Sequence, residues 1–194
     1  ASRREHKLEV ARRAYGLLTG KYEIPPEDII LDPLVFPCAT GDENYIGGAV
    51  ETIEALRLVK QELPYVRTIL GISNVSFGLP PAAREVVNSV FLYHATKAGL
   101  DLAIVNAEKL ERFASLAAED RRLAEDLLFN APVEGLEDRV AIHQHHIAAV
   151  SEHFRGRAQV KPQIAELPLD ERLARCIVEG ARDGLVADLD RKLR

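Results

Sequence analysis

The fold is decided by residues 66–75, which read Val66-Arg67-Thr68-Ile69-Leu70-Gly71-Ile72-Ser73-Asn74-Val75. The run is rich in β-branched and aliphatic side chains, which favour an extended strand. Pro64 precedes it, and Pro81 follows it at a position suited to the first turn of a helix. These residues predict a strand over 66–75 and a helix over 81–98, with Asn74 at the carboxyl end of the strand.

Helix and strand patterns alternate on both sides of this stretch. Apolar residues at helical spacing predict helices over residues 3–19, 47–63 and 116–129, whereas 29–31 and 100–105 are short apolar runs typical of strands. Successive strands joined by helices need long crossovers, and such crossovers give a parallel sheet. We therefore expect an α/β protein with both faces of the sheet covered.

The pattern changes after Pro132. Residues 136–154 predict a long helix, 156–168 form a polar connector, and 168–193 predict one more amphipathic helical stretch. No strand pattern returns in this part of the sequence. A linker and the beginning of a helical module are therefore expected to follow the sheet.

The composition is that of an ordinary soluble protein. Lys and Arg number 25 against 30 Asp and Glu, the formal net charge is −5, and 47% of residues are hydrophobic. No run approaches the roughly 18 apolar residues of a membrane span, and the mild acidity gives no reason to expect nucleic acid as a partner. Cys38 and Cys176 lie far apart, which suits a reducing compartment, so a cytoplasmic protein with two buried cysteines is expected.

Two features indicate a piece of a longer protein. The 194 residues contain no Met, and the chain opens at Ala1 within a helical pattern. Three strands are also too few to close a barrel or to protect the edges of an open sheet. The remaining strands are expected from sequence outside this chain.

Each of the three predicted strands ends in a polar residue. These residues are Asp32, Asn74 and Asn106. The carboxyl ends of parallel strands meet at one edge of a sheet, and in α/β barrels the reactive groups come from that edge. Asp and Asn are also common turn formers, so each residue alone fits a purely structural role. Together they predict a polar pocket.

The residues around these positions resemble a known family. Arg84 and the stretches 32–41, 71–78 and 103–107 closely resemble the folate-binding barrel of the cobalamin-dependent methionine synthases. The resemblance covers about residues 1–130. It implies that the three strands are the last three of a TIM-type (β/α)8 barrel whose first five strands lie upstream.

A shorter resemblance lies near the end of the chain. Residues 167–173 and 177–180 are similar to the start of the helical cap that precedes the cobalamin domain in the same family. The two resemblances together imply three parts: residues 1–131 as the C-terminal portion of the folate barrel, 132–166 as a helical linker, and 167–194 as the first part of the cap.

The family implies methyl transfer from 5-methyltetrahydrofolate to cob(I)alamin during the synthesis of methionine from homocysteine. Asp32 would accept the paired N–H groups of the pterin edge. Asn74 is the catalytic candidate, because its amide can donate a hydrogen bond to N5 as the methyl group leaves. Arg84 matches an arginine that contacts folate in the family, and Ser73 and Asn106 complete the expected folate-binding set.

The family also implies which groups this chain does not bind. Cobalamin belongs to another domain, and zinc belongs to a separate homocysteine domain. The expected partners are the folate substrate, the cobalamin-binding domain and the N-terminal half of the barrel. His143, His146 and His153 share one helical face and offer an alternative zinc site, but no Cys-x-x-Cys or His-Glu-x-x-His accompanies them. Solvated histidines on a linker helix, without a metal, are expected.

Two other functions remain open from the sequence. One is a different pterin-binding barrel, such as a corrinoid-protein methyltransferase or a dihydropteroate synthase. The latter needs a Lys and an Arg-x-His near the last strands, and neither occurs around residues 103–107. The other is a non-catalytic linker or interaction segment, since three strands alone make no competent pocket.

Overall fold

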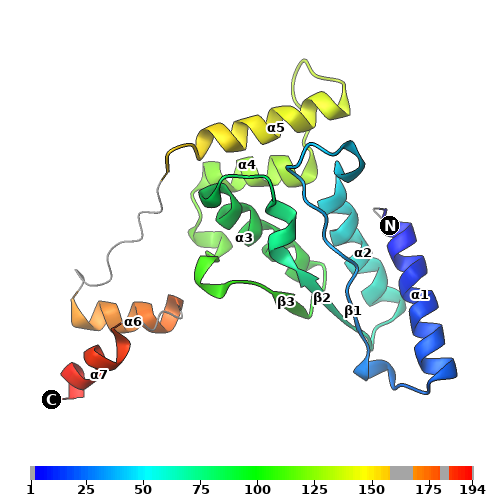
Figure 1. Ribbon diagram of the computed structural model, residues 1–194, viewed down its shortest axis with the longest axis horizontal. Helices are drawn as coiled ribbons and strands as arrows, with labels where there is room; N and C mark the ends of the chain where they lie inside the picture. Colours follow the sequence, from blue (N-terminus) through cyan, green and yellow to red (C-terminus); the bar gives the residue numbers. More distant parts are fainter. Residues whose placement is uncertain (1–2, 158–167, 180–183, 194) are drawn as a thin grey trace.

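The computed structural model describes residues 3–157, 168–179 and 184–193, and its elements alternate as the sequence predicts (Figure 1). Three strands and seven helices are described: α1 (Arg4–Lys21), β1 (Ile30–Leu31), α2 (Gly48–Glu62), β2 (Arg67–Gly71), α3 (Pro81–Lys97), β3 (Leu102–Ile104), α4 (Ala118–Phe129), α5 (Arg139–His153), α6 (Leu169–Glu179) and α7 (Leu185–Leu193). The 3₁₀ helices are η1 (Pro26–Asp28), η2 (Glu43–Tyr45), η3 (Ile72–Ser76), η4 (Ala107–Lys109) and η5 (Phe113–Ser115). No described helix is long and apolar enough to cross a membrane.

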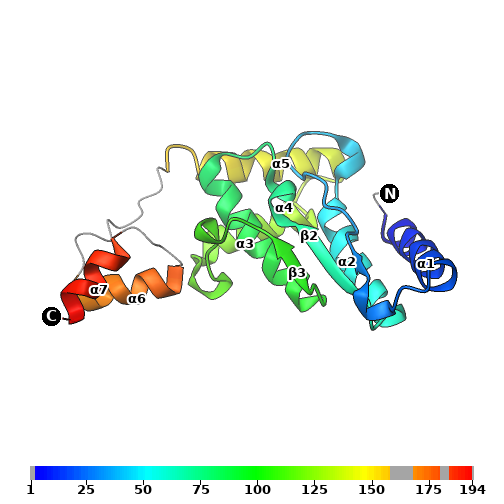
Figure 2. The same cartoon turned by 60° about the horizontal axis from the view of Figure 1, so that its bottom comes forward.

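The strands form a parallel sheet in the order β1-β2-β3. Leu31 is in register with Thr68, and Leu70 with Ala103. Because every crossover moves the chain one strand further in the same direction, right-handed connections place the helices on one side of the sheet. Neighbouring helices pack in chain order from α1 to α5, and α5 lies beside α4 in both views (Figures 1 and 2).

The main core lies between the sheet and these helices. Leu70 of β2 and Phe91 of α3 are completely buried there, together with Leu127 of α4. Each such side chain stabilises the fold by about 1.5–3 kcal/mol relative to exposure. The expected burial of both cysteines is confirmed, since Cys38 and Cys176 are each 3% exposed.

The opposite face of the sheet is apolar and open. Ile30 is 50% exposed, Leu102 39% and Ile104 62%. Ile30 pairs with Arg67, Leu102 with Ile69 and Ile104 with Gly71, so these exposed residues share one face. The expectation that both faces are covered is therefore wrong within the described residues, because the uniform strand order puts all the crossover helices on one side.

The strand predicted over residues 66–75 ends early. β2 stops at Gly71, whose register partner Ile104 is the last residue of β3. Beyond that point the backbone has no partner strand, and it bonds locally in η3 instead, as in the hydrogen bond from Phe77 N to Asn74 O at 3.4 Å. Asn74 thus lies in a 3₁₀ turn after the strand.

The predicted helical stretch over residues 168–193 is two helices. Gly184 has a φ of +76° and precedes α7. Charged side chains join the pair: Arg172 is hydrogen-bonded to Asp188, and Lys192 Nζ lies 2.5 Å from Asp170 Oδ1. Most of the predicted connector over residues 156–168 lies outside the described residues.

Candidate functional site

Asp32 follows β1 directly, and its carboxylate closes a turn. The Asp32 Oδ1 atom accepts a hydrogen bond from Leu34 N at 2.8 Å. Leu34 has a φ of +65°, in the left-handed region that branched residues rarely adopt. The Asp32 side chain is otherwise exposed, so its charge faces outward at the carboxyl edge of the sheet.

A buried lysine lies beneath this turn. Lys7 of α1 is only 4% exposed, and its Nζ donates to Pro33 O at 2.6 Å and to Leu34 O at 2.9 Å. Burial lowers the pKa of Lys7 to about 8, although the negative charges of Asp32 and Glu51 oppose this shift. Lys7 was not predicted from the sequence as a site residue.

Asn74 lies at the end of the neighbouring strand. It is exposed within η3, and a Cβ added to Gly71 would come within 3.1 Å of its Nδ2. The Asn74 amide therefore lies over Gly71, and no larger residue fits beneath it without displacing the amide. Ser73 next to it uses its carbonyl to accept a hydrogen bond from Ser76 Oγ at 3.2 Å.

The loop after β1 and the turn after β2 are in direct contact. Cys38 N donates to Val75 O at 2.9 Å. Gly78 has a φ of +98°, and a Cβ there would lie 2.4 Å from Ala39 O. Burial raises the pKa of the Cys38 thiol to about 12, so the thiol stays protonated and is no nucleophile. The contact joins the segment that carries Asp32 to the segment that carries Asn74.

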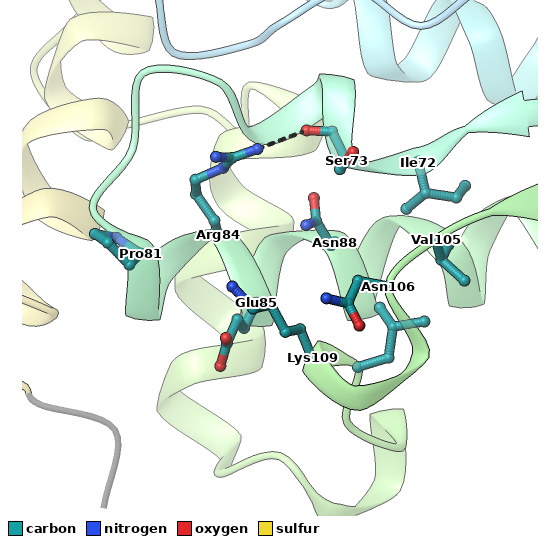
Figure 3. Close-up of a pocket in the computed structure, with 10 residues that line it drawn as sticks. Ile72, Ser73, Pro81, Arg84, Glu85, Asn88, Val105, Asn106 and Lys109 are labelled. Atoms are coloured by element: carbon teal, nitrogen blue, oxygen red, sulfur yellow. Dashed lines mark hydrogen bonds between the residues drawn. The ribbon is translucent and has the colours of Figure 1, made fainter. Parts of the chain in front are cut away.

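Three of the five predicted site residues line one cavity of about 230 Å³ between η3, α3 and η4. They are Ser73, Arg84 and Asn106, which Figure 3 shows around a common space. Asp32 and Asn74 are not among its lining residues. The structure therefore brings the predicted residues to one edge of the sheet but not into one cavity.

Arg84 attaches the start of α3 to η3. Its Nε donates to Ser76 Oγ at 3.1 Å, and its Nη2 donates to Ser73 O at 3.3 Å (Figure 3). The guanidinium also lies 4.6 Å from the centre of the Phe77 ring, within cation–π range. These contacts fix the wall of the cavity and the turn that carries Asn74.

The two asparagines of the cavity differ in how their oxygens are used. Asn106 Oδ1 accepts from Glu108 N at 3.2 Å and so caps η4. Asn88 also lines the cavity, and its Oδ1 is buried without a hydrogen-bond partner among the described residues (Figure 3). Asn88 was not predicted from the sequence, although its position one helical turn after Arg84 was an available signal.

The expectation of solvated histidines on the linker helix is wrong. His143 and His146 are 4% and 5% exposed, and His143 Nε2 donates to Cys38 O at 2.6 Å, while His146 Nε2 donates to Ala131 O at 2.8 Å. His153 Nε2 lies 2.6 Å from Asp120 Oδ1. The histidines are buried because they supply donors to backbone oxygens and a carboxylate of elements packed against α5.

The described residues contain no group of three or more His, Cys, Asp or Glu side chains arranged to hold a metal. Burial also lowers the pKa of His143, which keeps its ring neutral at pH 7. The chemistry available at this edge is therefore hydrogen bonding and charge: an outward carboxylate, side-chain amides and a fixed guanidinium.

Known proteins resemble this chain over nearly its whole length. A family model described as pterin binding enzyme matches residues 1–106. The methionine synthase of Mycobacterium tuberculosis (strain ATCC 25618 / H37Rv) is 42% identical over 189 residues, and that of Mycobacterium leprae (strain TN) is 40% identical over 186 residues. Each alignment covers 96% of this chain but only 15% of the relative.

Proposed function

Because the chain belongs to the family of pterin binding enzymes, we propose that it forms the C-terminal part of the folate-binding barrel of a methionine synthase. The proposed reaction is methyl transfer from 5-methyltetrahydrofolate to cob(I)alamin, which leads to methionine from homocysteine. The observation that carries the proposal is the hydrogen bond from Cys38 N to Val75 O at 2.9 Å. It joins the loops after two adjacent parallel strands, where Asp32 and Asn74 lie.

The open sheet face supports a partial barrel. In a closed barrel the helices surround the strands, and side chains from the inner face of every strand fill the interior. The exposed Ile30, Leu102 and Ile104 would then face the remaining five strands of a (β/α)8 barrel. We assign residues 1–131 to this barrel, 132–166 to the linker and 167–194 to the start of a helical cap.

Asp32 and Asn74 have different proposed roles at the substrate. An ionised Asp32 accepts hydrogen bonds from the donor edge of the pterin and fixes its orientation. Asn74 Nδ2 donates to N5 and stabilises the electron pair that remains on this nitrogen when the methyl group leaves. Neither residue acts as the nucleophile.

The neighbouring cavity adds a second set of polar contacts. Arg84 already donates to Ser73 O and Ser76 Oγ, so we assign it to the cavity wall, with its remaining N–H groups available to folate. Asn88 Oδ1 is an unused acceptor in that wall, and a donor on the substrate would satisfy it. Ser73 and Asn106 complete this set.

The described residues do not fit cobalamin or a zinc ion. His143, His146 and His153 use their Nε2 atoms on protein oxygens, and the Cys38 thiol is buried and protonated. We therefore assign the binding of cobalamin and zinc to other parts of the complete protein; cobalamin would reach this site only as the acceptor of the methyl group.

Binding of 5-methyltetrahydrofolate by the complete protein tests the proposal. Isothermal titration calorimetry should give an affinity that Asp32→Asn lowers by about 10- to 100-fold, as expected for a lost charged hydrogen bond. Asp28→Asn is the matched control, because Asp28 is exposed in η1 before β1, at the other end of the strand. This control should bind as the wild type does.

The transfer step needs its own measurement. Asn74→Ala should slow the single-turnover transfer of the methyl group by about 100-fold, the range found for removal of one transition-state donor. Wild-type binding without any transfer would favour another pterin-binding enzyme. Absence of binding would favour the non-catalytic alternative.

A further inference from the structure

The turn that presents Asp32 is held by side chains from two helices. Its left-handed residue, Leu34, offers its N–H to Asp32 Oδ1 and its carbonyl to the opposite side of the turn. That carbonyl accepts from Lys7 Nζ at 2.9 Å and lies 3.2 Å from Thr52 Oγ1, whose single proton is shared with Gly48 O at 3.0 Å. A branched residue disfavours this conformation, so the bonds to its carbonyl select it.

The Lys7 side chain is buried beneath the turn and does not lie on the surface. Its Nζ bonds two successive carbonyls, those of Pro33 and Leu34, and lies 5.1 Å from the centre of the Phe36 ring. The charged groups that face it are Asp32 on the loop and Glu51 on α2. Glu51 is already paired with Arg4 at 2.8 Å, so Asp32 is the carboxylate left to Lys7.

We propose that Lys7 is a positioning residue for Asp32: it fixes the Pro33–Leu34 turn and thereby aims the Asp32 carboxylate at the substrate. This inference rests on the proposed function, in which Asp32 binds the pterin. Lys7 itself touches only the turn. Its loss therefore displaces a substrate-binding group without removing one.

A charge-dependent effect separates this role from simple support of the fold. Lys7 loses its charge as the pH rises through its pKa of about 8, and this weakens its hydrogen bonds and its attraction to Asp32. The folded state is favoured by the same change, because a buried charge is removed. Substrate affinity should thus fall with rising pH while stability rises.

Lys60 provides a matched control. It is a half-buried lysine that also donates to a backbone carbonyl, Val66 O at 3.1 Å, and pairs with Asp101 at 2.9 Å. Val66 and Asp101 precede β2 and β3, so Lys60 lies at the amino ends of the strands, away from the candidate site. Lys60→Met removes comparable contacts without touching the Asp32 turn.

The experiment measures the Kd of 5-methyltetrahydrofolate for the complete protein between pH 6.5 and 9.5. Lys7→Met should weaken binding at pH 7 by about 10- to 100-fold, the cost of a misplaced reacting or binding group, whereas Lys60→Met should stay within about twofold. The wild type should lose affinity above about pH 8, where the pKa of Lys7 lies, and Lys7→Met should lack this loss. Thr52→Val, which removes the other donor to Leu34 O, should give a smaller loss of about threefold to tenfold.

Several results would overturn the inference. One is a Lys7→Met variant that binds 5-methyltetrahydrofolate with the wild-type Kd. Another is a wild-type Kd that does not change from pH 7 to 9.5, a measurement that does not depend on any variant. If the wild type binds no folate, the proposed function fails separately. Hydrogen exchange of the backbone amides in residues 31–37 then tests the positioning role without folate. Lys7→Met should accelerate this exchange and Lys60→Met should not. Unchanged exchange in Lys7→Met would refute the positioning role.

Discussion

Gly78 sets the distance between the two loops of the candidate site. Its φ of +98° suits glycine, and the space where a Cβ would lie is filled by the Ala39 carbonyl, 2.4 Å away. Any side chain at this position must push the loop after β1 away from the turn after β2. The neighbouring hydrogen bond from Cys38 N to Val75 O would be strained by the same movement.

Gly78→Ala should therefore lower the free energy of unfolding more than the same substitution does at a left-handed glycine with open space around it. Conformational cost alone is about 1–2 kcal/mol, and the clash with backbone should raise the total to about 3 kcal/mol. Gly41→Ala is the control, because Gly41 has a φ of +79° and nothing within 4 Å of an added Cβ. Urea unfolding compares the two, and equal losses would show that the Ala39 contact yields easily.

The buried charge of Lys7 predicts how stability depends on pH. Because its pKa falls from 10.5 to about 8 on folding, the unfolded chain binds more protons between these values, and stability rises with pH in that interval. Relative to Lys7→Met, the wild type should gain up to about 3 kcal/mol between pH 8 and 10.5. Denaturant titrations of both proteins across this range measure the gain, and parallel curves would contradict it.

Helix α5 is attached to the sheet region by its histidines. His143 reaches Cys38 O in the loop after β1, and its Nδ1 lies 3.1 Å from the Asn130 amide at the end of α4. Arg139 on the same helix is hydrogen-bonded to Ile46 O. Helix α5 thus also holds the loop that carries Asp32.

Acid should loosen this attachment. Burial lowers the pKa of His143 below its usual 6.5, so the unfolded chain takes up a proton that the folded chain resists, and stability falls as the pH drops below about 6.5. His143→Gln should cost about 1–3 kcal/mol at pH 7 through its lost buried hydrogen bonds, and it should flatten the acid slope. The exposed His145 on the same helix is the control, and His145→Gln should keep the wild-type slope.

Local patterns predicted the elements well and their long-range partners poorly. Apolar spacing and proline positions determine α1 to α5, so these helices and all three strands were found. The end of β2 depends on where β3 stops, and the burial of His143 depends on a carbonyl 105 positions away, neither of which a local pattern contains. Lys7 left a weak signal, since it lies at helical spacing from Ala11 and Ala14 on an apolar stripe.

The candidate site likewise has a part that local patterns predicted and a part that they did not. The position of Asp32 and Asn74 after neighbouring strands follows from parallel pairing and was predicted. The separate cavity with Asn88 was not, because it forms between η3, α3 and η4 only after the chain turns back on itself. The edge of the sheet that carries the candidate site could thus be predicted from the sequence, but the cavity at this edge could not.

Across the whole molecule, the open sheet face predicts opposite effects in two contexts. Ile104 is 62% exposed here, so Ile104→Asn should reduce self-association of the isolated chain. If the complete protein closes the proposed barrel, the same change would bury an amide in the barrel interior and cost about 1–3 kcal/mol. Light scattering and thermal unfolding measure the two effects, with Val186→Asn, an exposed apolar site on α7, as the control.

Lys7 also limits where such a protein can be truncated at its N-terminal side. It belongs to the helix upstream of β1, so a truncation that starts at the first strand would keep Asp32 and every strand described here while discarding the lysine beneath it. Such a fragment would also lose Leu8 and Ala11, which pack against Val59 and Leu31, and its Asp32 carboxylate would no longer be held in one orientation. A shortened variant meant to keep the Asp32 turn should therefore keep α1 as well, together with the barrel strands proposed to lie upstream.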